Sequence, residues 1–192
     1  MQDDFFVVGL AASGLGISAM TSFFTHLSDA PNAAFIIATH QRRDRESLLR
    51  KIVLRFTAMP VHQVEGPTEI QPGHVYIITE NTYIVIRDKL VTVEKRPHTA
   101  ENNAIDILFK SIADQYRERA IGIVFWGMGN DAVNGSKEIE ASGGFVIVQR
   151  PDRTIQSQMA RSTVEHDDPD FIVDTEDIAA VLENYMGTYS QK

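Results

Sequence analysis

The sequence predicts one α/β domain with a doubly wound, mostly parallel sheet and an appended antiparallel meander. Short apolar runs of strand length alternate with segments whose apolar residues recur at helical spacing, as in parallel strands joined by helices. The middle of the chain instead carries consecutive runs that we interpret as antiparallel strands. No internal repeat or low-complexity linker interrupts the chain, so we expect a single domain over residues 1–192.

The segment of residues 5–27 sets the arrangement of the predicted sheet. Residues 5–8 are apolar, as in a buried parallel strand, and apolar residues then recur at helical spacing. A bend of small residues joins the two, with Ser13 as its one reactive side chain and Gly14 and Gly16 beside it. Such a bend lies at the carboxyl edge of a sheet, where the unpaired N–H groups of the helix point. It suits either a bound phosphate or an activated serine.

A second strand, a helix and an edge strand are expected next. Residues 33–39 are a second buried strand, and His40 follows it directly. Residues 42–55 have helical spacing and contain six of the chain's 18 basic residues, which form either a solvated face or a basic patch for an acidic partner. Residues 59–64 contain Pro60 and predict a short strand near an edge. The apolar face of the predicted helix consists of Leu48, Leu49, Ile52, Val53 and Phe56.

The second half of the chain supplies the meander and the remaining elements. Residues 105–116 have helical spacing, and residues 120–126 form a buried strand that ends in a glycine-rich turn at residues 127–131. The meander is expected over residues 75–79, 83–87 and 90–94. The last expected elements are a helix ending at residue 142, strands at 145–149 and 171–173, and a helix over 175–185 capped by Thr175.

Composition excludes several classes of function. A net charge of −8 argues against nucleic acid as the main partner, because phosphate contacts need a basic surface. The absence of cysteine excludes disulfides, thiol nucleophiles and zinc-thiolate sites, and no set of residues has metal-site spacing. No apolar run is long enough for a membrane span, and the acidic start predicts no secretory signal. We therefore expect a cytoplasmic protein without membrane insertion.

Three polar side chains follow three of the predicted parallel strands. Ser13, His40 and Asp131 each come just after a strand, and the carboxyl ends of parallel strands meet at one edge of the sheet. A hydroxyl, an imidazole and a carboxylate are the components of a hydrolytic triad, which occurs in several chain orders. The alternatives are a turn serine, a loop histidine and an Asp131 that only caps a helix. His98 lies in a polar loop that we expect to overhang the same edge.

Dinucleotide binding is the rival interpretation of the first bend. The glycine fingerprint requires glycine at position 11, which is Ala11, and an acidic residue at the end of the second strand, where Thr39 and His40 stand. The nucleophile-elbow pattern also fails, because Ala11 and Leu15 occupy its glycine positions. An NAD site is therefore disfavoured, and we expect no cofactor.

Several motifs resemble the catalytic domain of the bacterial chemotaxis protein-glutamate methylesterases. The turn at 127–131, Gly-Met-Gly-Asn-Asp, is the most specific, since it is close to the family's T-G-M-G-x-D-G. Residues 8–16 resemble the family's first strand and serine turn. The other similar stretches are residues 39–49, 59–77, 104–111 and 159–162, and the resemblance covers nearly the whole chain.

The resemblance implies hydrolysis of glutamate γ-methyl esters on chemoreceptor helices, with release of methanol and possible deamidation of glutamine. Ser13 would be the nucleophile, His40 the general base and Asp131 its orienting carboxylate. The backbone N–H groups of Met128 and Gly14 would hold the oxyanion. The substrate-binding candidates are Gly16, Arg42, Arg161 and His98.

Several residues depart from the family pattern. Ala11, Leu15 and Ala132 replace glycines, and a side chain at such a position strains or blocks the site if the glycine served a positive φ or a close approach. Trp126 replaces a threonine, and Ala160 replaces a proline. The second hypothesis is therefore a degenerate domain that binds a receptor or another protein without turnover. The family's receiver domain is missing, so the chain is either independent or part of a longer protein, such as a fusion with the partner methyltransferase.

Overall fold

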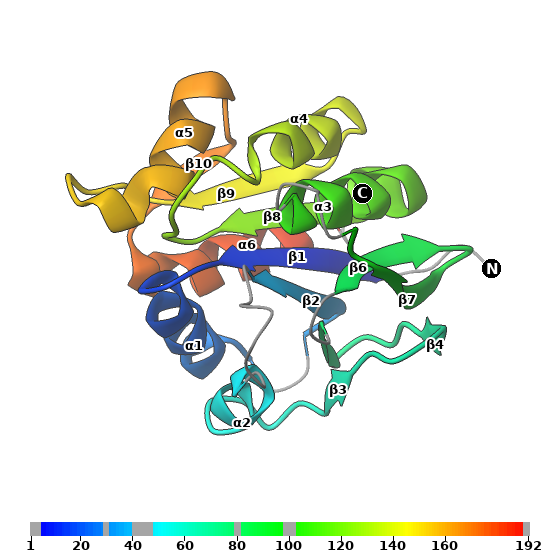
Figure 1. The fold of residues 1–192 in the computed structure, drawn as a ribbon. Helices are drawn as coiled ribbons and strands as arrows, with labels where there is room; N and C mark the ends of the chain where they lie inside the picture. The colour runs from blue at the N-terminus through cyan, green and yellow to red at the C-terminus, as the bar shows by residue number, and fades with distance from the viewer. Residues whose placement is uncertain (1–4, 29–30, 40–47, 79–81, 98–102, 190–192) are drawn as a thin grey trace.

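The computed structural model describes residues 5–28, 31–39, 48–78, 82–97 and 103–189. In this part of the chain a seven-stranded parallel sheet forms the centre of the molecule (Figure 1). Its strands are β1 (Phe6–Ala12), β2 (Ala33–Thr39), β3 (Val61–Gln63), β5 (Val75–Ile77), β8 (Ala120–Val124), β9 (Phe145–Gln149) and β10 (Phe171–Val173). They lie in the order β10-β9-β8-β1-β2-β5-β3, so β1 is central and β3 is at an edge, as predicted.

The antiparallel part is a separate, smaller sheet. It contains β4 (Thr68–Glu69), β6 (Thr82–Arg87) and β7 (Leu90–Lys95) in the order β4-β7-β6. The predicted meander was wrong in its first run, because β5 pairs in parallel with β2 and β3 instead. All three residues of β5 are buried, so both of its faces are covered, as is typical of a parallel strand. The two-residue β4 was not predicted from the sequence.

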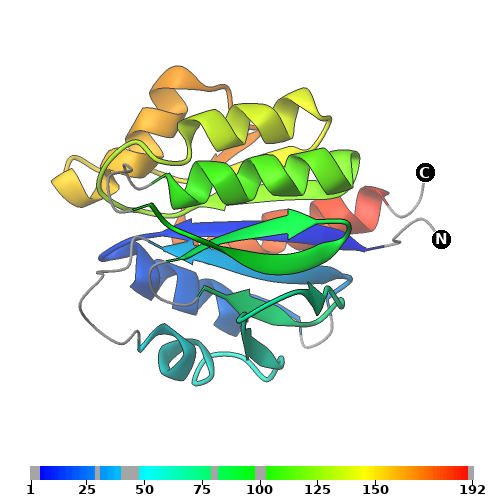
Figure 2. The same ribbon diagram turned by 45° about the vertical axis from the view of Figure 1, so that its right-hand side comes forward.

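Helices cover both faces of the parallel sheet (Figure 2). One face packs against α1 (Gly16–His26), α2 (Leu49–Val53) and α6 (Ile178–Tyr189). The other packs against α3 (Ala104–Tyr116), α4 (Val133–Ala141), α5 (Gln158–His166) and the antiparallel sheet. The short 3₁₀ helices are η1 (Arg117–Arg119), η2 (Ile155–Ser157) and η3 (Thr175–Asp177).

Burial on both sides explains the apolar sequence of β1. Phe6, Val8 and Leu10 belong to the core beneath α1 and α6, whereas Val7 and Ala11 belong to the core beneath α3. All are fully buried, and each large side chain removed from water contributes about 1.5–3 kcal/mol of transfer free energy. The strand prediction over this segment, and the doubly wound fold class with it, are confirmed.

Some predicted helices differ from those observed. Within the described residues α2 has five residues, and Leu48 and Phe56, expected on its buried face, are exposed. α5 was not predicted. Thr175 does not cap the last helix, because its hydroxyl accepts a hydrogen bond from Gln149 Nε2 at 2.8 Å. No helix of the described chain has the length and apolar character needed to cross a bilayer.

The strand order reverses between β1 and β8. The chain leaves β1 toward α1 on one face, and it leaves β8 toward α4 on the opposite face. The turns that follow these neighbouring strands therefore start side by side at the carboxyl edge of the sheet and lead to opposite faces. Open α/β sheets bind ligands at such a switch point.

The two ends of the described chain meet at the opposite edge of the sheet. The ring of Phe6, at the start of β1, contacts the ring of Tyr189, the last residue of α6, with 5.3 Å between centroids. Both ends therefore lie at the amino edge, away from the turn that carries Ser13.

Candidate functional site

The turn that carries Ser13 begins directly after the central strand. The N–H of Ser13 donates to the carbonyl oxygen of Trp126 at 3.1 Å, and the carbonyl oxygen of Ser13 accepts the N–H of Gly16 at 3.1 Å. Gly14 has a φ of +58°, which glycine adopts without steric cost. The half-buried serine is thus held between the end of β1 and the start of α1.

Gly16 allows this helix to start in contact with the next strand end. A Cβ atom at position 16 would lie 1.8 Å from the carbonyl oxygen of Trp126, so any side chain would displace α1. Its predicted contact with substrate stays a prediction, while packing accounts for the glycine.

The glycine-rich turn after β8 packs against the serine. A Cβ atom on Gly127 would lie 3.2 Å from the Cβ of Ser13 and 2.5 Å from the Cε of Met159. The Gly127 carbonyl oxygen also accepts the N–H of Met159 at 2.8 Å, which links the turn to α5. Met128 is 57% exposed, and Gly129 has a φ of +87°. The backbone of this turn therefore borders the serine, where an oxyanion hole is predicted.

Asp131 is fixed at the start of α3. The residue is 6% exposed, and its carboxylate accepts the N–H groups of Ile105 at 3.0 Å and Asp106 at 2.9 Å. These N–H groups lie at the positive end of the helix, where a carboxylate is stabilised. Asp131 therefore caps α3 and not α4, the helix directly after it, and its predicted role toward His40 stays a prediction.

Asp106, which belongs to α3, caps the first turn of α4 in the same way. Its Oδ1 accepts the N–H groups of Ala132 at 3.0 Å and Gly135 at 2.7 Å, and its Oδ2 accepts Asn134 Nδ2 at 3.3 Å. Burial raises the pKa of Asp106, the nearby charge of Asp131 adds to the rise, and the N–H donors oppose it. The two aspartates thus exchange caps between α3 and α4, and this pair positions Asp131.

The three replaced glycines differ in their backbone conformations. Ala132 has a φ of +120°, a region that L-residues rarely adopt, and its side chain is fully buried. Leu15 has an ordinary right-handed φ of −64°, and Ala11 lies within β1 without a positive φ. Only the substitution at position 132 therefore strains the backbone.

Three predicted site residues lie outside the described part of the chain: His40, Arg42 and His98. The parallel register pairs Ala12 with Thr39, so the residues that precede Ser13 and His40 in the chain are neighbours across the sheet. The structure brings the Ser13 turn against the turn that carries Met128, and Asp131 ends that second turn. The Ser-His-Asp triad remains a prediction.

Arg161 binds the loop that precedes its helix. Its Nη2 donates to the carbonyl oxygens of Asp152 at 2.7 Å and Thr154 at 3.0 Å, and to Ser157 Oγ at 3.0 Å. The guanidinium therefore supports the loop over η2, and its predicted contact with substrate stays untested.

Two residues near the site were not singled out from the sequence. Gln156 in η2 accepts the N–H of Leu15 with its Oε1 at 3.4 Å, next to the serine turn, and nothing in its sequence context indicates this contact. Asp106 lies in one of the stretches that carry the family resemblance. Its pairing with Asp131 could not be predicted, because the two residues are far apart in the sequence.

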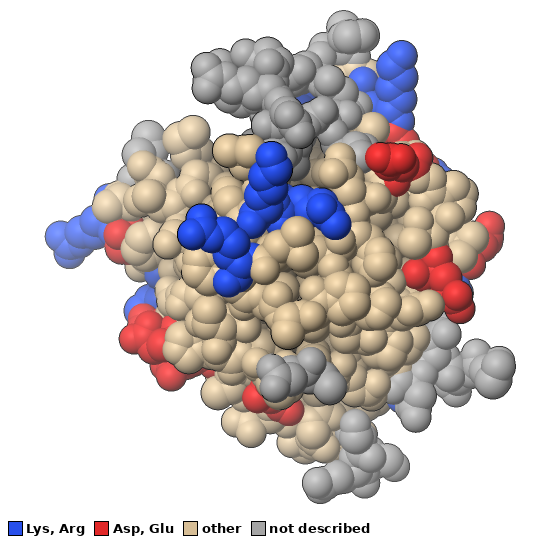
Figure 3. All heavy atoms as spheres, turned by 90° about the horizontal axis from the view of Figure 1, so that it is seen from below, with Lys and Arg blue, Asp and Glu red and all other residues tan. Residues whose placement is uncertain are grey.

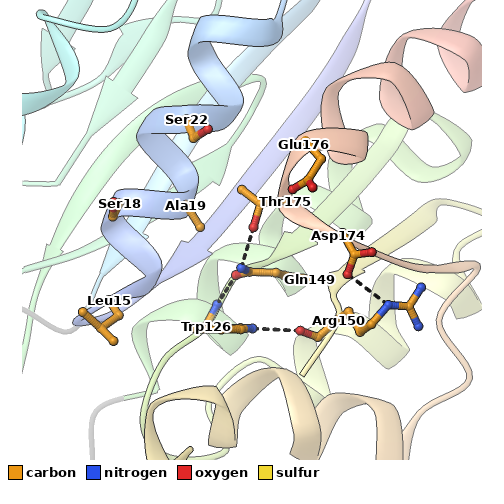
Figure 4. A pocket seen from close by; sticks show the side chains of 10 residues that line it. All are labelled: Leu15, Ser18, Ala19, Ser22, Trp126, Gln149, Arg150, Asp174, Thr175 and Glu176. Carbon is orange, nitrogen blue, oxygen red and sulfur yellow. Dashed lines mark hydrogen bonds and ion pairs between the residues drawn. The ribbon is translucent and has the colours of Figure 1, made fainter. Parts of the chain in front are cut away.

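A cavity of about 510 Å³ lies beside the serine turn (Figure 4). Its walls come from α1, Trp126, the end of β9 and η3. Leu15, which is 54% exposed, belongs to this wall, and the N–H of Trp126 is held by Gln149 Oε1 at 2.9 Å. The cavity therefore shares Leu15 and Trp126 with the segments that hold Ser13 in place.

Basic residues of α2 and of the turn after it lie on the underside of the molecule. Arg50, Lys51 and Arg55 are exposed, and in the view from below Lys and Arg side chains gather on a face that is otherwise mostly uncharged (Figure 3). The exposure of these described residues fits both alternatives, a solvated face and a basic patch for an acidic partner. Its partner remains a prediction.

Comparison with known proteins identifies the family of this chain. Residues 8–182 match the model of the CheB methylesterase family. The chain belongs to the CheB methylesterase family. The resemblance inferred from the sequence is thus confirmed.

Relatives in this family differ in length. A Leptospira interrogans protein named for protein-glutamate methylesterase/protein-glutamine glutaminase activity is 26% identical over 185 residues, covering 95% of this chain and 94% of that protein. A Geobacillus kaustophilus protein-glutamate methylesterase/protein-glutamine glutaminase is 25% identical over 187 residues, covering 94% of this chain but 54% of its own length. The crystal structure of the Thermotoga maritima CheB methylesterase catalytic domain has the same fold, with a TM-score of 0.83, 20% identity, and coverage of 94% of this chain and 98% of that one.

Proposed function

We propose that this chain is a serine esterase that hydrolyses glutamate γ-methyl esters on a chemoreceptor and releases methanol. The observation that carries the proposal is the contact between the Ser13 turn and the turn at residues 127–131, at the switch point of the sheet. A nucleophile and backbone N–H donors are required side by side for acyl transfer. The names of the curated relatives supply the substrate class.

In the proposed reaction Ser13 Oγ attacks the ester carbonyl carbon while His40 accepts its proton. The N–H groups of Met128 and Gly14 stabilise the resulting oxyanion, and Asp131 orients His40. Collapse of the intermediate expels methanol, which takes the proton from His40 and leaves an acyl-serine. Water then attacks with His40 as base, which frees the glutamate carboxylate and restores Ser13. An amide in place of the ester would give ammonia, as the glutaminase part of the relatives' name suggests.

Methanol release from a methyl-esterified chemoreceptor fragment tests the proposal. We expect Ser13→Ala to lower kcat/KM by on the order of 10⁴-fold or more, because no other residue replaces the nucleophile. Ser28→Ala is the matched control, since it removes an exposed hydroxyl just beyond the far end of α1 and should leave the rate unchanged. Equal rates for wild type and Ser13→Ala would contradict the esterase mechanism.

A binding module without turnover is the second candidate. The strained Ala132 next to Asp131 and the exposed Leu15 beside Ser13 favour it, because both replace smaller residues at the site. It predicts that the fragment binds wild type and Ser13→Ala with the same Kd, and that wild type releases no methanol. Methanol release that depends on Ser13 would exclude it.

A further inference from the structure

The wall of the cavity beside the serine turn has more negatively than positively charged side chains. Arg150 is already engaged, since its Nε donates to Asp174 Oδ1 at 3.0 Å and one of its terminal nitrogens donates to the Ile172 carbonyl oxygen at 3.0 Å. This pair cancels one positive and one negative charge in the wall. Glu176 also lines the cavity and adds a second carboxylate. The wall therefore contains two carboxylates and one guanidinium, which is a formal excess of one negative charge.

The rest of the lining suits the long side chain of a basic residue. Ala19 and Ser22 of α1 point across the cavity toward Thr175 and Glu176 (Figure 4). Small and hydroxyl side chains leave room for an alkyl stem and accept hydrogen bonds from a charged head group. Trp126 adds an aromatic surface, which attracts a cation that approaches its ring face.

The cavity is positioned to contact the same molecule that reaches Ser13. Leu15, two residues beyond Ser13, forms part of its wall, and the backbone of Trp126 is hydrogen-bonded to the Ser13 N–H. A residue one or two helical turns from the reacting glutamate of a helical substrate would be displaced by about 5–11 Å along the helix axis. That displacement is within the reach of a lysine or arginine side chain.

We infer that this cavity is a specificity subsite that binds a lysine or arginine side chain of the protein substrate, with Glu176 as its charged partner. The inference rests on the proposed function, because it assigns to the substrate a basic residue close to the esterified glutamate.

Helical peptides that carry one methyl-esterified glutamate test the subsite. One series carries a single lysine three, four or seven residues before or after that glutamate, and a matched series carries norleucine, which keeps the stem without the charge. Methanol release gives kcat/KM, and fluorescence anisotropy with the Ser13→Ala variant gives Kd without turnover. We expect one lysine position to improve Kd and kcat/KM about two- to fivefold over norleucine, the range of a partly exposed ion pair.

Two substitutions of Glu176 identify the group responsible. Glu176→Gln should remove the preference for lysine, and Glu176→Lys should reverse it toward a glutamate at the same position. Asp177→Asn is the matched control, because Asp177 is the adjacent exposed acid and does not line the cavity. The control should keep the preference for lysine.

The outcomes separate this inference from the proposed function. Methanol release without a lysine preference, or with one that survives Glu176→Gln, overturns the subsite and leaves the esterase in place. Glu176-dependent binding of the lysine peptide without methanol release supports the subsite and overturns the esterase. If the peptides show neither a lysine preference nor methanol release, the subsite and the esterase are both overturned.

Discussion

Ala132 carries backbone strain next to Asp131. Its φ of +120° is rare for a residue with a side chain, and such conformations cost about 1–3 kcal/mol. The residue cannot relax independently, because its N–H is held by Asp106 and its neighbour Asp131 caps α3. The strain therefore acts on the segment that places the predicted triad carboxylate.

Replacing this alanine by glycine should stabilise the protein. We expect Ala132→Gly to raise the free energy of unfolding by about 1 kcal/mol, because the relief of strain exceeds the greater entropy of glycine in the unfolded chain. Urea denaturation measures the change. As a control, Ala113→Gly inside α3 should lower stability by about 1 kcal/mol. A loss of stability at position 132 as well would show that its backbone is not strained.

At the scale of elements, the capping exchange joins α3 and α4 through two carboxylates. Asp131 accepts N–H groups from α3, and Asp106 accepts them from α4. Each helix therefore depends on the other for the cap of its first turn. This link fixes the last residue of the turn after β8, Asp131, whereas Gly127 at the start of that turn packs against Ser13.

Removal of Asp106 should disturb both stability and catalysis. We expect Asp106→Ala to lower the free energy of unfolding by about 2–3 kcal/mol, because buried N–H groups lose their acceptor. Methanol release should also fall, with little change in KM, because Asp106 acts through Asp131 rather than on substrate. Asp114→Ala, on the exposed side of the same helix, should cost less than about 0.5 kcal/mol. An Asp106→Ala variant with normal stability and normal kcat would exclude the role of Asp106 in positioning Asp131.

The ends of α4 and α5 meet at a carboxyl pair. Burial raises the pKa of Glu140 to about 8, a hydrogen bond with Asp167 adds to the rise, and the charges of Asp167, Asp170 and Asp168 raise it further. The folded protein then holds a proton that the unfolded chain releases above its ordinary pKa of 4.5. This contribution to stability is complete below pH 4.5 and is lost as the pH rises through about 8.

Melting temperatures at pH 6 and pH 9 test this pair. The wild type should melt at a lower temperature at pH 9, and Glu140→Gln should remove most of the difference, because glutamine keeps a hydrogen-bond donor without titrating. Glu165→Gln changes an exposed glutamate of α5 and should retain the wild-type difference. Equal pH dependence in wild type and Glu140→Gln would contradict the assignment.

At the scale of the whole molecule, charge is distributed unevenly. The chain has a net charge of −8, yet α2 and the residues after it present Arg50, Lys51 and Arg55 to solvent. A basic face on an acidic protein orients the approach of an acidic partner and affects the association rate more than the final complex. An acidic receptor segment would be such a partner.

Charge reversal on this face should slow association. We expect the double variant Lys51→Glu and Arg55→Glu to lower the association rate with an acidic chemoreceptor fragment about two- to tenfold at low salt. The difference should shrink as salt is added, because screening weakens long-range attraction. Lys137→Glu on α4, which covers the opposite face of the sheet, is the control and should change the rate little. Stopped-flow measurement with equal rates for all three proteins would contradict steering by α2.

Most of the parallel core could be predicted from the sequence, because burial on both faces gives continuous apolar runs such as β1, β2 and β8. β5 was assigned to the wrong sheet, since three residues cannot reveal which strands flank them. α5 was missed because its buried residues are only Met159, Ala160 and Thr163, and the last of these is polar. The positions of Ser13 and Asp131 beyond strands were predictable. The pairing of Asp131 with Asp106 was not, because it depends on how two distant helices meet.

The contact between Phe6 and Tyr189 has a consequence for attachment. The described chain begins and ends at the amino edge, and Ser13 lies seven residues beyond Phe6, roughly 23 Å away at the rise of a strand. A dye attached at the described residues Phe5 or Tyr189 would thus leave the turn that carries Ser13 open unless its linker is long enough to return across the sheet. The fold therefore places these attachment points and the Ser13 turn at opposite edges of the sheet.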